Sequence, residues 1–338
     1  MRPKQLPGFC LLVLLALVGC KKSGNVKPAN KRDTTIYVSG NSQLGPIVWT
    51  NRFAAVLPGL TGFGVTSAIT ASGGDVYIVG SSFAAGNIGT AVYWKNKVIT
   101  KLSDGQTNAE GKAIAIAGSD VYVAGTVSAN GTTDAAYWKN GTVINLAGSA
   151  AFTSSQALGI AINGSDVYVC GNIVKNGRQS QAVYWKNGLL NEITDGSAPG
   201  YAVAITVKNN SVHIAYNIYT PNSAAVASYY WKDGISTQPS NTFAYSELHA
   251  VTVDANNVYL AGNALTGAQV APVIWKNNAI QTLPTLTAYT AATSINIFGS
   301  DVYVTGYDSG PVYWKNGIMV RLVAPTDYQT TGISIVTR

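Results

Sequence analysis

From residue 34 onward, short runs of alternating apolar and polar residues recur along the chain, each followed by a tight-turn signal. The clearest runs are Gly-Ser-Asp-Val-Tyr-Val-Ala-Gly at residues 118–125 and Val-Tyr-Trp-Lys-Asn-Gly at residues 183–188. Alternation with a period of two is typical of strands with one buried face, and Asn-Gly after an apolar run favours a type I′ hairpin turn. The pattern predicts an all-β chain built of hairpins.

These two phrases each recur seven times. All seven tryptophans fall in the second phrase, 39 to 47 residues apart, and the residue two places after each is Asn or Asp. In six copies a further run precedes the first phrase, in which a small residue stands before Ile or Val. A more mixed run, such as residues 98–102, follows each tryptophan and fits an outer edge strand. Four strands per repeat at this period predict a β-propeller.

The two ends of the chain complement each other. The first repeat, from Ile36 to Leu57, lacks a first strand of its own, and a matching run appears only at the C-terminus, at residues 331–337. We therefore expect the C-terminal strand to join the N-terminal blade and close the ring. The prediction is one domain at residues 34–338, a seven-bladed propeller of four-stranded antiparallel blades, which we expect to be monomeric.

The repeats differ from one another mainly in their connections. In an antiparallel blade, the turns after strands one and three lie on one face, here called the short-turn face. The connections after strands two and four lie on the other, the long-loop face, which carries the variable segments at residues 80–90, 125–134, 216–228, 239–248 and 324–331. Function is expected where repeats disagree, so the long-loop face is the predicted binding face.

Blade five departs most from the repeat. His213 stands in the aromatic position held by Tyr elsewhere, Tyr216 replaces a glycine, and Asp233 replaces an asparagine. Aromatic residues with polar tips suit stacking on sugar rings or anchoring a peptide. We predict a ligand site between blades five and six, formed by Tyr201, His213, Tyr216, Tyr219, Phe243, Tyr245, Glu247 and His249. The alternative is a drifted blade whose large residues only fill space.

Charge excludes one class of partner. The chain carries a net charge of +7, but seven of its basic residues precede residue 34, leaving 15 Lys and Arg against 14 Asp and Glu beyond it. A nearly neutral propeller lacks the basic surface that phosphate backbones require, so we do not expect nucleic acid as a partner. A hydrophobic content of 47% with 11% charged residues argues for a packed core.

At the N-terminus, Arg2 and Lys4 precede an apolar stretch at residues 9–18 that is too short to span a bilayer. Its end, Leu17-Val18-Gly19-Cys20, resembles the lipobox of bacterial lipoproteins, in which the cysteine is lipidated after cleavage. The resemblance implies a signal peptide at residues 1–19, lipid on Cys20 and a flexible basic tether at residues 20–33. We expect a lipid-anchored protein of the cell envelope, at the outer membrane since no aspartate follows Cys20; the alternative is an ordinary secretory signal.

Motifs for chemistry are absent from the sequence. It has no His-Glu-x-x-His, no Gly-x-Ser-x-Gly and no calcium loop, so no catalytic residue, metal or cofactor is expected. Cys170 stands at a small-residue position and is expected to be a packed core thiol. The repeated aspartates and lysines are expected to serve the fold, with each aspartate capping the amides of its turn and each lysine beside it, at Asp75, Asp120, Asp166, Asp301, Lys95, Lys139, Lys186, Lys232, Lys276 and Lys315.

The phrases Asp-Val-Tyr-Val-Ala-Gly and Val-Tyr-Trp-Lys-Asn-Gly resemble extracellular repeat lipoproteins of bacteria, including HAF-type repeats. This resemblance covers residues 34–338 and implies a secreted propeller without a particular activity. The function we expect is a non-enzymatic binding or scaffold module for a glycan, peptide or protein. One alternative is a structural subunit of an envelope complex. The other is a carbohydrate-active enzyme whose acids lie scattered in loops, with Glu110, Asp134, Glu247, Asp308 and Asp327 as candidates.

Overall fold

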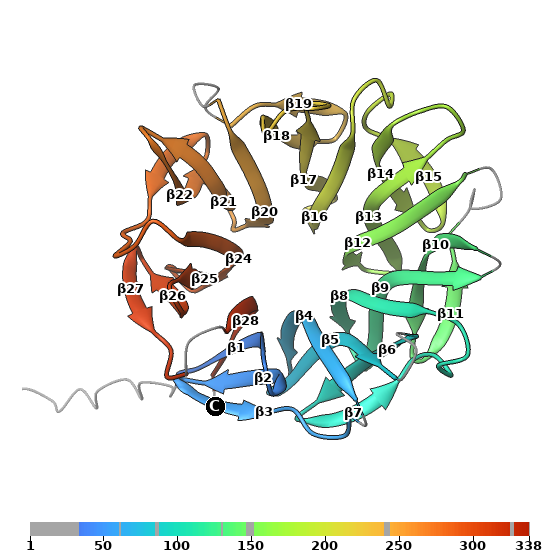
Figure 1. Cartoon of the computed structure of the whole chain (residues 1–338), viewed down its shortest axis with the longest axis horizontal. Helices are drawn as coiled ribbons and strands as arrows, with labels where there is room; N and C mark the ends of the chain where they lie inside the picture. The colour runs from blue at the N-terminus through green and yellow to red at the C-terminus, as the bar shows by residue number, and fades with distance from the viewer. Residues whose placement is uncertain are drawn as a thin grey trace, which may run out of the picture. The chain divides into compact units, whose positions relative to one another are not determined.

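The propeller consists of seven four-stranded antiparallel sheets arranged in a ring (Figure 1). The computed structural model describes residues 34–337 except 61, 85–87, 130, 147–151, 240–243 and 325–327. The first strands of the seven blades surround the centre of the ring, and the fourth strands lie at its rim. The predicted fold class, with its seven blades, is confirmed.

The blades follow one another in chain order, and only blade one combines both ends of the described chain. Blade one contains β28 (Gln329–Thr337), β1 (Thr34–Ser42), β2 (Gly45–Thr50) and β3 (Phe53–Val56). Blades two to four contain β4 (Phe63–Ser72), β5 (Asp75–Phe83), β6 (Gly89–Lys95), β7 (Val98–Lys101); β8 (Ala109–Ala117), β9 (Asp120–Ala129), β10 (Thr132–Lys139), β11 (Thr142–Asn145); and β12 (Ser154–Asn163), β13 (Asp166–Val174), β14 (Ser180–Lys186), β15 (Leu189–Glu192). Blades five to seven contain β16 (Gly200–Lys208), β17 (Ser211–Tyr219), β18 (Val226–Lys232), β19 (Ile235–Thr237); β20 (Ser246–Val253), β21 (Val258–Thr266), β22 (Gln269–Lys276), β23 (Ala279–Thr282); and β24 (Thr290–Phe298), β25 (Asp301–Asp308), β26 (Pro311–Lys315), β27 (Ile318–Arg321).

The C-terminal strand closes the ring as predicted. β28 pairs antiparallel with β1, placing Ile335 opposite Ile36 and Ile333 opposite Val38. Ile333 and Val38 are both buried in the core cluster shared with blade seven. The strand begins at Gln329, two residues before the predicted start, and so reaches farther toward the long-loop face.

A tryptophan on the third strand packs in the core of each blade, and in six blades a glycine on the second strand lies beside it. Six of the seven tryptophans are almost completely buried. A Cβ atom on Gly306 would lie 1.9 Å from the carbonyl oxygen of Ala291 and 2.7 Å from the Trp314 ring. No side chain fits there without displacing one of them, because packed interiors leave no spare volume. This explains the glycine of the first phrase in six blades.

The repeated polar residues join the two turns of the short-turn face within one blade. In blade three, Asn140 accepts a hydrogen bond from the Val121 amide at 2.9 Å and donates one to Asp120 at 2.9 Å. Lys139 pairs with the Asp120 carboxylate at 3.1 Å and lies over the Tyr122 ring, 5.2 Å from its centroid. Hydrogen bonds from Asn140 and Lys139 lower the pKa of Asp120. The expected structural role is thus supported, but the asparagine caps the amide rather than the aspartate.

That asparagine is placed by its backbone. Asn140 and Gly141 have φ angles of 50° and 87°, the two positive values that a type I′ turn requires. The Asn or Asp two places after each tryptophan has a positive φ in all seven blades, at Asn51, Asn96, Asn140, Asn187, Asp233, Asn277 and Asn316. The hairpin turns read from the sequence are therefore present.

The connections on the long-loop face are shorter than the sequence suggests. β9 extends to Ala129 and β10 starts at Thr132, so little remains of the connection expected at residues 125–134. The connection expected at residues 216–228 shrinks to residues 220–225. In blade five, the small polar residues that suggested a loop lie in strands, and Asn217 and Ser228 hydrogen-bond to blade six.

The expected signal peptide, Cys20 and the tether lie outside the described residues. Within the part of the chain that the structure describes, no helix is long and apolar enough to cross a membrane.

Candidate binding sites on the long-loop face

Four of the predicted ligand residues meet at the long-loop ends of blades five and six. The Glu247 carboxylate lies between two phenols, accepting a hydrogen bond from Tyr219 at 2.6 Å and another from Tyr245 at 2.6 Å. The Tyr201 ring packs edge-on against Tyr219 with ring centroids 5.5 Å apart. The strands explain this meeting, because β16 and β20 start, and β17 ends, at the same face.

The phenols of this cluster are committed to Glu247. Burial is the main cause that raises the pKa of both Tyr219 and Tyr245, and the hydrogen bond to Glu247 raises it further. Both phenols therefore stay protonated and donate to the carboxylate, whose two oxygens are both occupied. The cluster holds blades five and six together and leaves few groups for a ligand.

His249 lies beside this cluster at an irregularity in β20. The register shifts between Leu248 and Ala250, which leaves His249 as the extra residue. Its Nε2 atom lies 3.2 Å from Asn263 Nδ2 and 4.0 Å from a Glu247 oxygen. Asn263 Oδ1 accepts the Ala292 amide of blade seven, so its Nδ2 faces the imidazole and Nε2 acts as the acceptor. Burial lowers the pKa of His249, partly opposed by Glu247.

Two of the predicted residues, His213 and Tyr216, do not join the cluster. His213 is buried near the short-turn end of β17, with Nδ1 2.5 Å from Tyr230 Oη. Tyr216 is buried within blade five, stacks on Tyr229 and donates to Ser236. Both side chains are buried inside the blade, as the drifted-blade interpretation expects. β17 runs from one face of the blade to the other, so it carries these two residues away from the long-loop face. Phe243 lies outside the described residues.

Tyr216 also changes the packing of Trp231, the tryptophan of blade five. It occupies the glycine position that elsewhere leaves room for the indole ring. Trp231 is the most exposed of the seven tryptophans, at 8%, and packs against Tyr184 of blade four with centroids 5.2 Å apart. The substitution is thus accommodated inside the fold.

The candidate acids are largely occupied by structural partners. Lys112 pairs with Glu110 at 2.5 Å, and Glu247 accepts the two phenols. Asp308 is completely buried and pairs with Arg321 at 3.1 Å. Asp134 is half-buried on β10, and Asp327 lies outside the described residues. Among the described residues, no three His, Cys, Asp or Glu side chains gather as a metal site.

Cys170, the one cysteine that the structure describes, is completely buried. Burial raises the pKa of its thiol, which keeps it protonated and unreactive. Its expected role as a packed core residue is supported.

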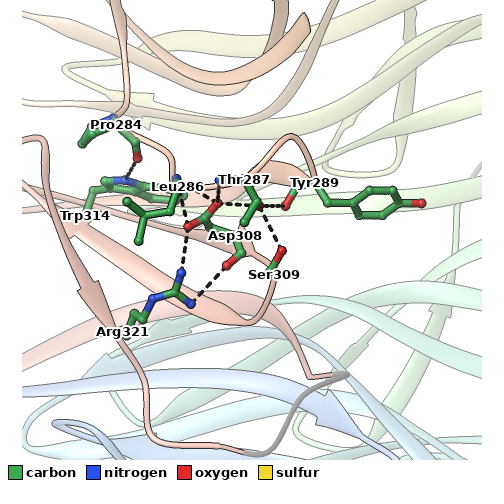
Figure 2. A network of polar contacts seen from close by, with 8 residues as sticks. All are labelled: Pro284, Leu286, Thr287, Tyr289, Asp308, Ser309, Trp314 and Arg321. Atoms are coloured by element: carbon green, nitrogen blue, oxygen red, sulfur yellow. Dashed lines mark hydrogen bonds and ion pairs between the residues drawn. The ribbon is translucent and has the colours of Figure 1, made fainter.

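Asp308 organises the loop between blades six and seven (Figure 2). Its carboxylate accepts hydrogen bonds from the amides of Leu286 and Thr287 and from the Thr287 hydroxyl. Arg321 donates to both the side chain and the backbone oxygen of Asp308. These contacts fix residues 286–289, and Figure 2 shows the Tyr289 ring directed away from the network.

A pocket of about 480 Å³ lies beside this loop, where blade seven meets blade one, and is here called the seam pocket. The rings of Tyr289 and Tyr307 stand nearly perpendicular there, with centroids 6.4 Å apart. Its lining residues are Tyr289, Thr290, Ala291, Thr293, Tyr307, Gln329 and Thr330. Sequence reasoning missed this site, although Tyr307 departs from the repeat as clearly as Tyr216 does.

Other hollows lie on the short-turn face, where the repeated ion pair is missing. One pocket of about 410 Å³ includes Tyr37 and Thr50 of blade one, and one of about 170 Å³ includes Ser211 and Lys232 of blade five. Thr50 stands in the lysine position and Ser211 in the aspartate position.

Comparison with known proteins places the chain by fold alone. No family model and no curated protein matches the sequence. A structure from a study of two prolyl endopeptidases aligns with a TM-score of 0.50 and 10% identity, over 90% of this chain and 50% of that one. The chain thus spans about half the length of that protein. The computationally designed Ika8 protein aligns with a TM-score of 0.44 and 19% identity, over 77% of this chain and 74% of that one.

Proposed function

We propose that this protein is a non-enzymatic binding module of the bacterial cell envelope, held at a membrane by lipid on Cys20. The propeller fold suits a binding or scaffold role because it is a rigid body with two broad faces. The envelope location rests on the Leu17-Val18-Gly19-Cys20 sequence. The ligand is proposed to bind the long-loop face.

One observation carries the proposal: the seam pocket is lined by phenols, hydroxyls, one amide and one methyl group. A mostly pre-formed concavity with a few polar groups is typical of small-molecule sites. Glycosidase chemistry needs two opposed carboxylates, and among the described residues none lines this pocket. The arrangement therefore favours binding over hydrolysis.

The test uses a soluble propeller starting at residue 34 and neutral polysaccharide and peptide fractions from bacterial envelopes. We expect saturable binding by one fraction, with the bound material recovered unchanged in length and composition. The matched pair of variants is Thr290→Arg, which places a long charged side chain in the seam pocket, and Thr142→Arg at an exposed blade rim. Only Thr290→Arg should abolish binding.

Two results would contradict the proposal. Shortened or chemically altered ligand after incubation would support the enzyme alternative. No binding to either fraction, or equal binding by both variants, would remove the long-loop face as a binding surface.

A further inference from the structure

The seam pocket exists because blade seven breaks the repeat at two positions. The first follows the glycine of the second strand, where the other blades carry Asn41, Ser81, Thr126, Asn172, Asn217 and Asn263 and blade seven carries Tyr307. In blade five, Asn217 links the blades by accepting from the Leu248 amide and donating to the Leu248 carbonyl, both at 2.9 Å. Tyr307 is too large for this link.

Threonines take over the link at the seam. Thr330 donates to the Gly306 carbonyl at 3.0 Å, and its hydroxyl lies 3.1 Å from that of Thr293. The contact between blades seven and one is thus kept by β28 rather than by β25. Because Thr330 makes the contact between the blades, the residue at position 307 is not needed to link them.

The second break is Ala291, which lies directly across from Tyr307 in the β24–β25 pair. The equivalent first-strand residues are larger in every other blade: Val65, Glu110, Gln156, Tyr201, Glu247 and Gln329. A methyl group leaves open the space that these side chains fill. Two independent departures, one larger and one smaller, therefore shape the same pocket.

Tyr289 forms the outer wall of the seam pocket, and its loop is fixed before any ligand binds. Tyr289 is 79% exposed, which is unusual for a tyrosine in a chain whose core is rich in aromatic residues. Ser309 donates its amide to the Tyr289 carbonyl, and Asp308 anchors the preceding residues. Because the loop is already fixed, a ligand would lose little binding free energy in ordering it.

The lining selects the ligand by its charge. Thr290 and Gln329 each offer both donors and acceptors, whereas the hydroxyls of Thr293 and Thr330 are already hydrogen-bonded within the seam. Apart from the phenols, none of the described residues that line the pocket is ionisable. A charged ligand would lose its hydration without gaining a partner of opposite charge. A sugar ring presents C–H groups to an aromatic face and hydroxyls around its edge, which matches this lining.

We propose that the seam pocket binds a short neutral saccharide, with a sugar ring against Tyr289 and Tyr307 and its hydroxyls bonded to Thr290 and Gln329. This deepens the proposed function, on which it rests, by naming the ligand class. It also moves the site from the junction of blades five and six to the junction of blades seven and one.

The test titrates the soluble propeller calorimetrically with cellobiose, maltose, lactose and diacetylchitobiose. A glucuronic acid disaccharide and a neutral Pro- and Tyr-containing peptide serve as comparisons. We expect at least one neutral disaccharide to bind, and the charged one not to bind.

Three variants locate the site. Tyr289→Ala should weaken disaccharide binding by about tenfold, since it removes one aromatic wall. Leu286→Ala, an exposed residue of the same loop outside the pocket lining, should leave binding unchanged. Ala291→Gln restores the side chain that blades one and four carry and should abolish binding, with the melting temperature showing that the blade still folds.

The outcomes separate this inference from the proposed function. Disaccharide binding that survives both Tyr289→Ala and Ala291→Gln would overturn the site. Binding of only the peptide or only the charged sugar, sensitive to Ala291→Gln, would overturn the ligand class and keep the binding module. Absence of any binding, including to the envelope fractions, would overturn both.

Discussion

Arg321 on the outermost strand of blade seven reaches past β26 to pair with Asp308 on β25, with Nη2 3.1 Å from Oδ2. The Asp308 side chain is completely buried, whereas the Arg321 side chain remains 44% exposed. Asp308 also accepts hydrogen bonds from loop amides. Together these contacts join the fourth strand, the second strand and the Tyr289 loop into one unit.

Replacing Asp308 by Ala should therefore destabilise the propeller strongly. The change leaves the Leu286 and Thr287 amides without their acceptor and Arg321 without its counterion, and loss of hydrogen bonds to a buried charged group costs about 1.5 to 3 kcal/mol. Urea unfolding followed by tryptophan fluorescence measures the loss. Asp75→Ala, in an exposed ion pair, is the control and should leave the midpoint nearly unchanged. Equal effects would mean that burial of Asp308 has no energetic consequence.

Removal of residues 331–338 should weaken the whole propeller far more than the loss of eight residues suggests. The deletion removes the buried Ile333 and Ile335 and exposes the free edge of β1. Differential scanning calorimetry should show a lower and broader transition, and proteolysis should begin in blade one. A chain lacking only residue 338 is the control. An unchanged cooperative melt would contradict ring closure as a source of stability.

Stability should fall as the pH falls below neutrality because of the two histidines. Burial lowers the pKa of both His213 and His249 below the usual 6.5, so the folded protein holds them neutral. The unfolded chain binds protons first, so the stabilisation is complete above pH 6.5 and is lost as the pH falls below that value. His249→Gln should flatten this decline in melting temperature. A variant slope as steep as that of the wild type would assign the effect to other groups.

The cluster around Glu247 is predicted to support the fold rather than a ligand. Tyr219→Phe and Tyr245→Phe each remove a hydrogen bond to the carboxylate, and each should lower the free energy of unfolding by about 1.5 to 3 kcal/mol. Disaccharide affinity at the seam pocket should not change. A variant with lost affinity and unchanged unfolding would return the ligand site to blades five and six.

Lipid attachment is tested by Cys20→Ala in the full-length chain. We expect the variant to lose incorporation of labelled palmitate and to partition into the soluble fraction. The wild type should remain with membranes after a high-salt wash, because acyl chains do not depend on electrostatic attraction. Retention of the variant in washed membranes would contradict lipid on Cys20 as the anchor.

The fold could be predicted from the sequence because nearly the same motifs recur in every blade. The Asn-Gly turns and the tryptophans recur at a regular spacing and predict the blades. The first strand is missing from the first repeat and appears at the C-terminus, which predicts the closed ring. The prediction that the aspartate caps the turn amide was wrong, because Asn140 does so in blade three. Which side chain reaches the amide depends on the positive φ of Asn140, but the predicted number of blades does not depend on this detail.

The site was harder to predict because it depends on distance along strands. His213 and Tyr219 are six residues apart, which in an extended strand is roughly 20 Å, so they lie near opposite faces. Ala291 and Tyr307 are far apart in sequence but directly opposed in the sheet, after a register shift between Ala292 and Ser294. A substitution to alanine attracts little notice in a sequence rich in small residues, yet here it opens the pocket.

The pairing of Thr34 with Thr337 has a consequence for orientation. β1 is a second strand, and every second strand enters its blade at the short-turn face, so Thr34 lies at that face. Tyr289 and Tyr307 lie at the opposite face. A lipid on Cys20, as proposed, would thus be attached to the propeller through Thr34, at the face opposite the seam pocket.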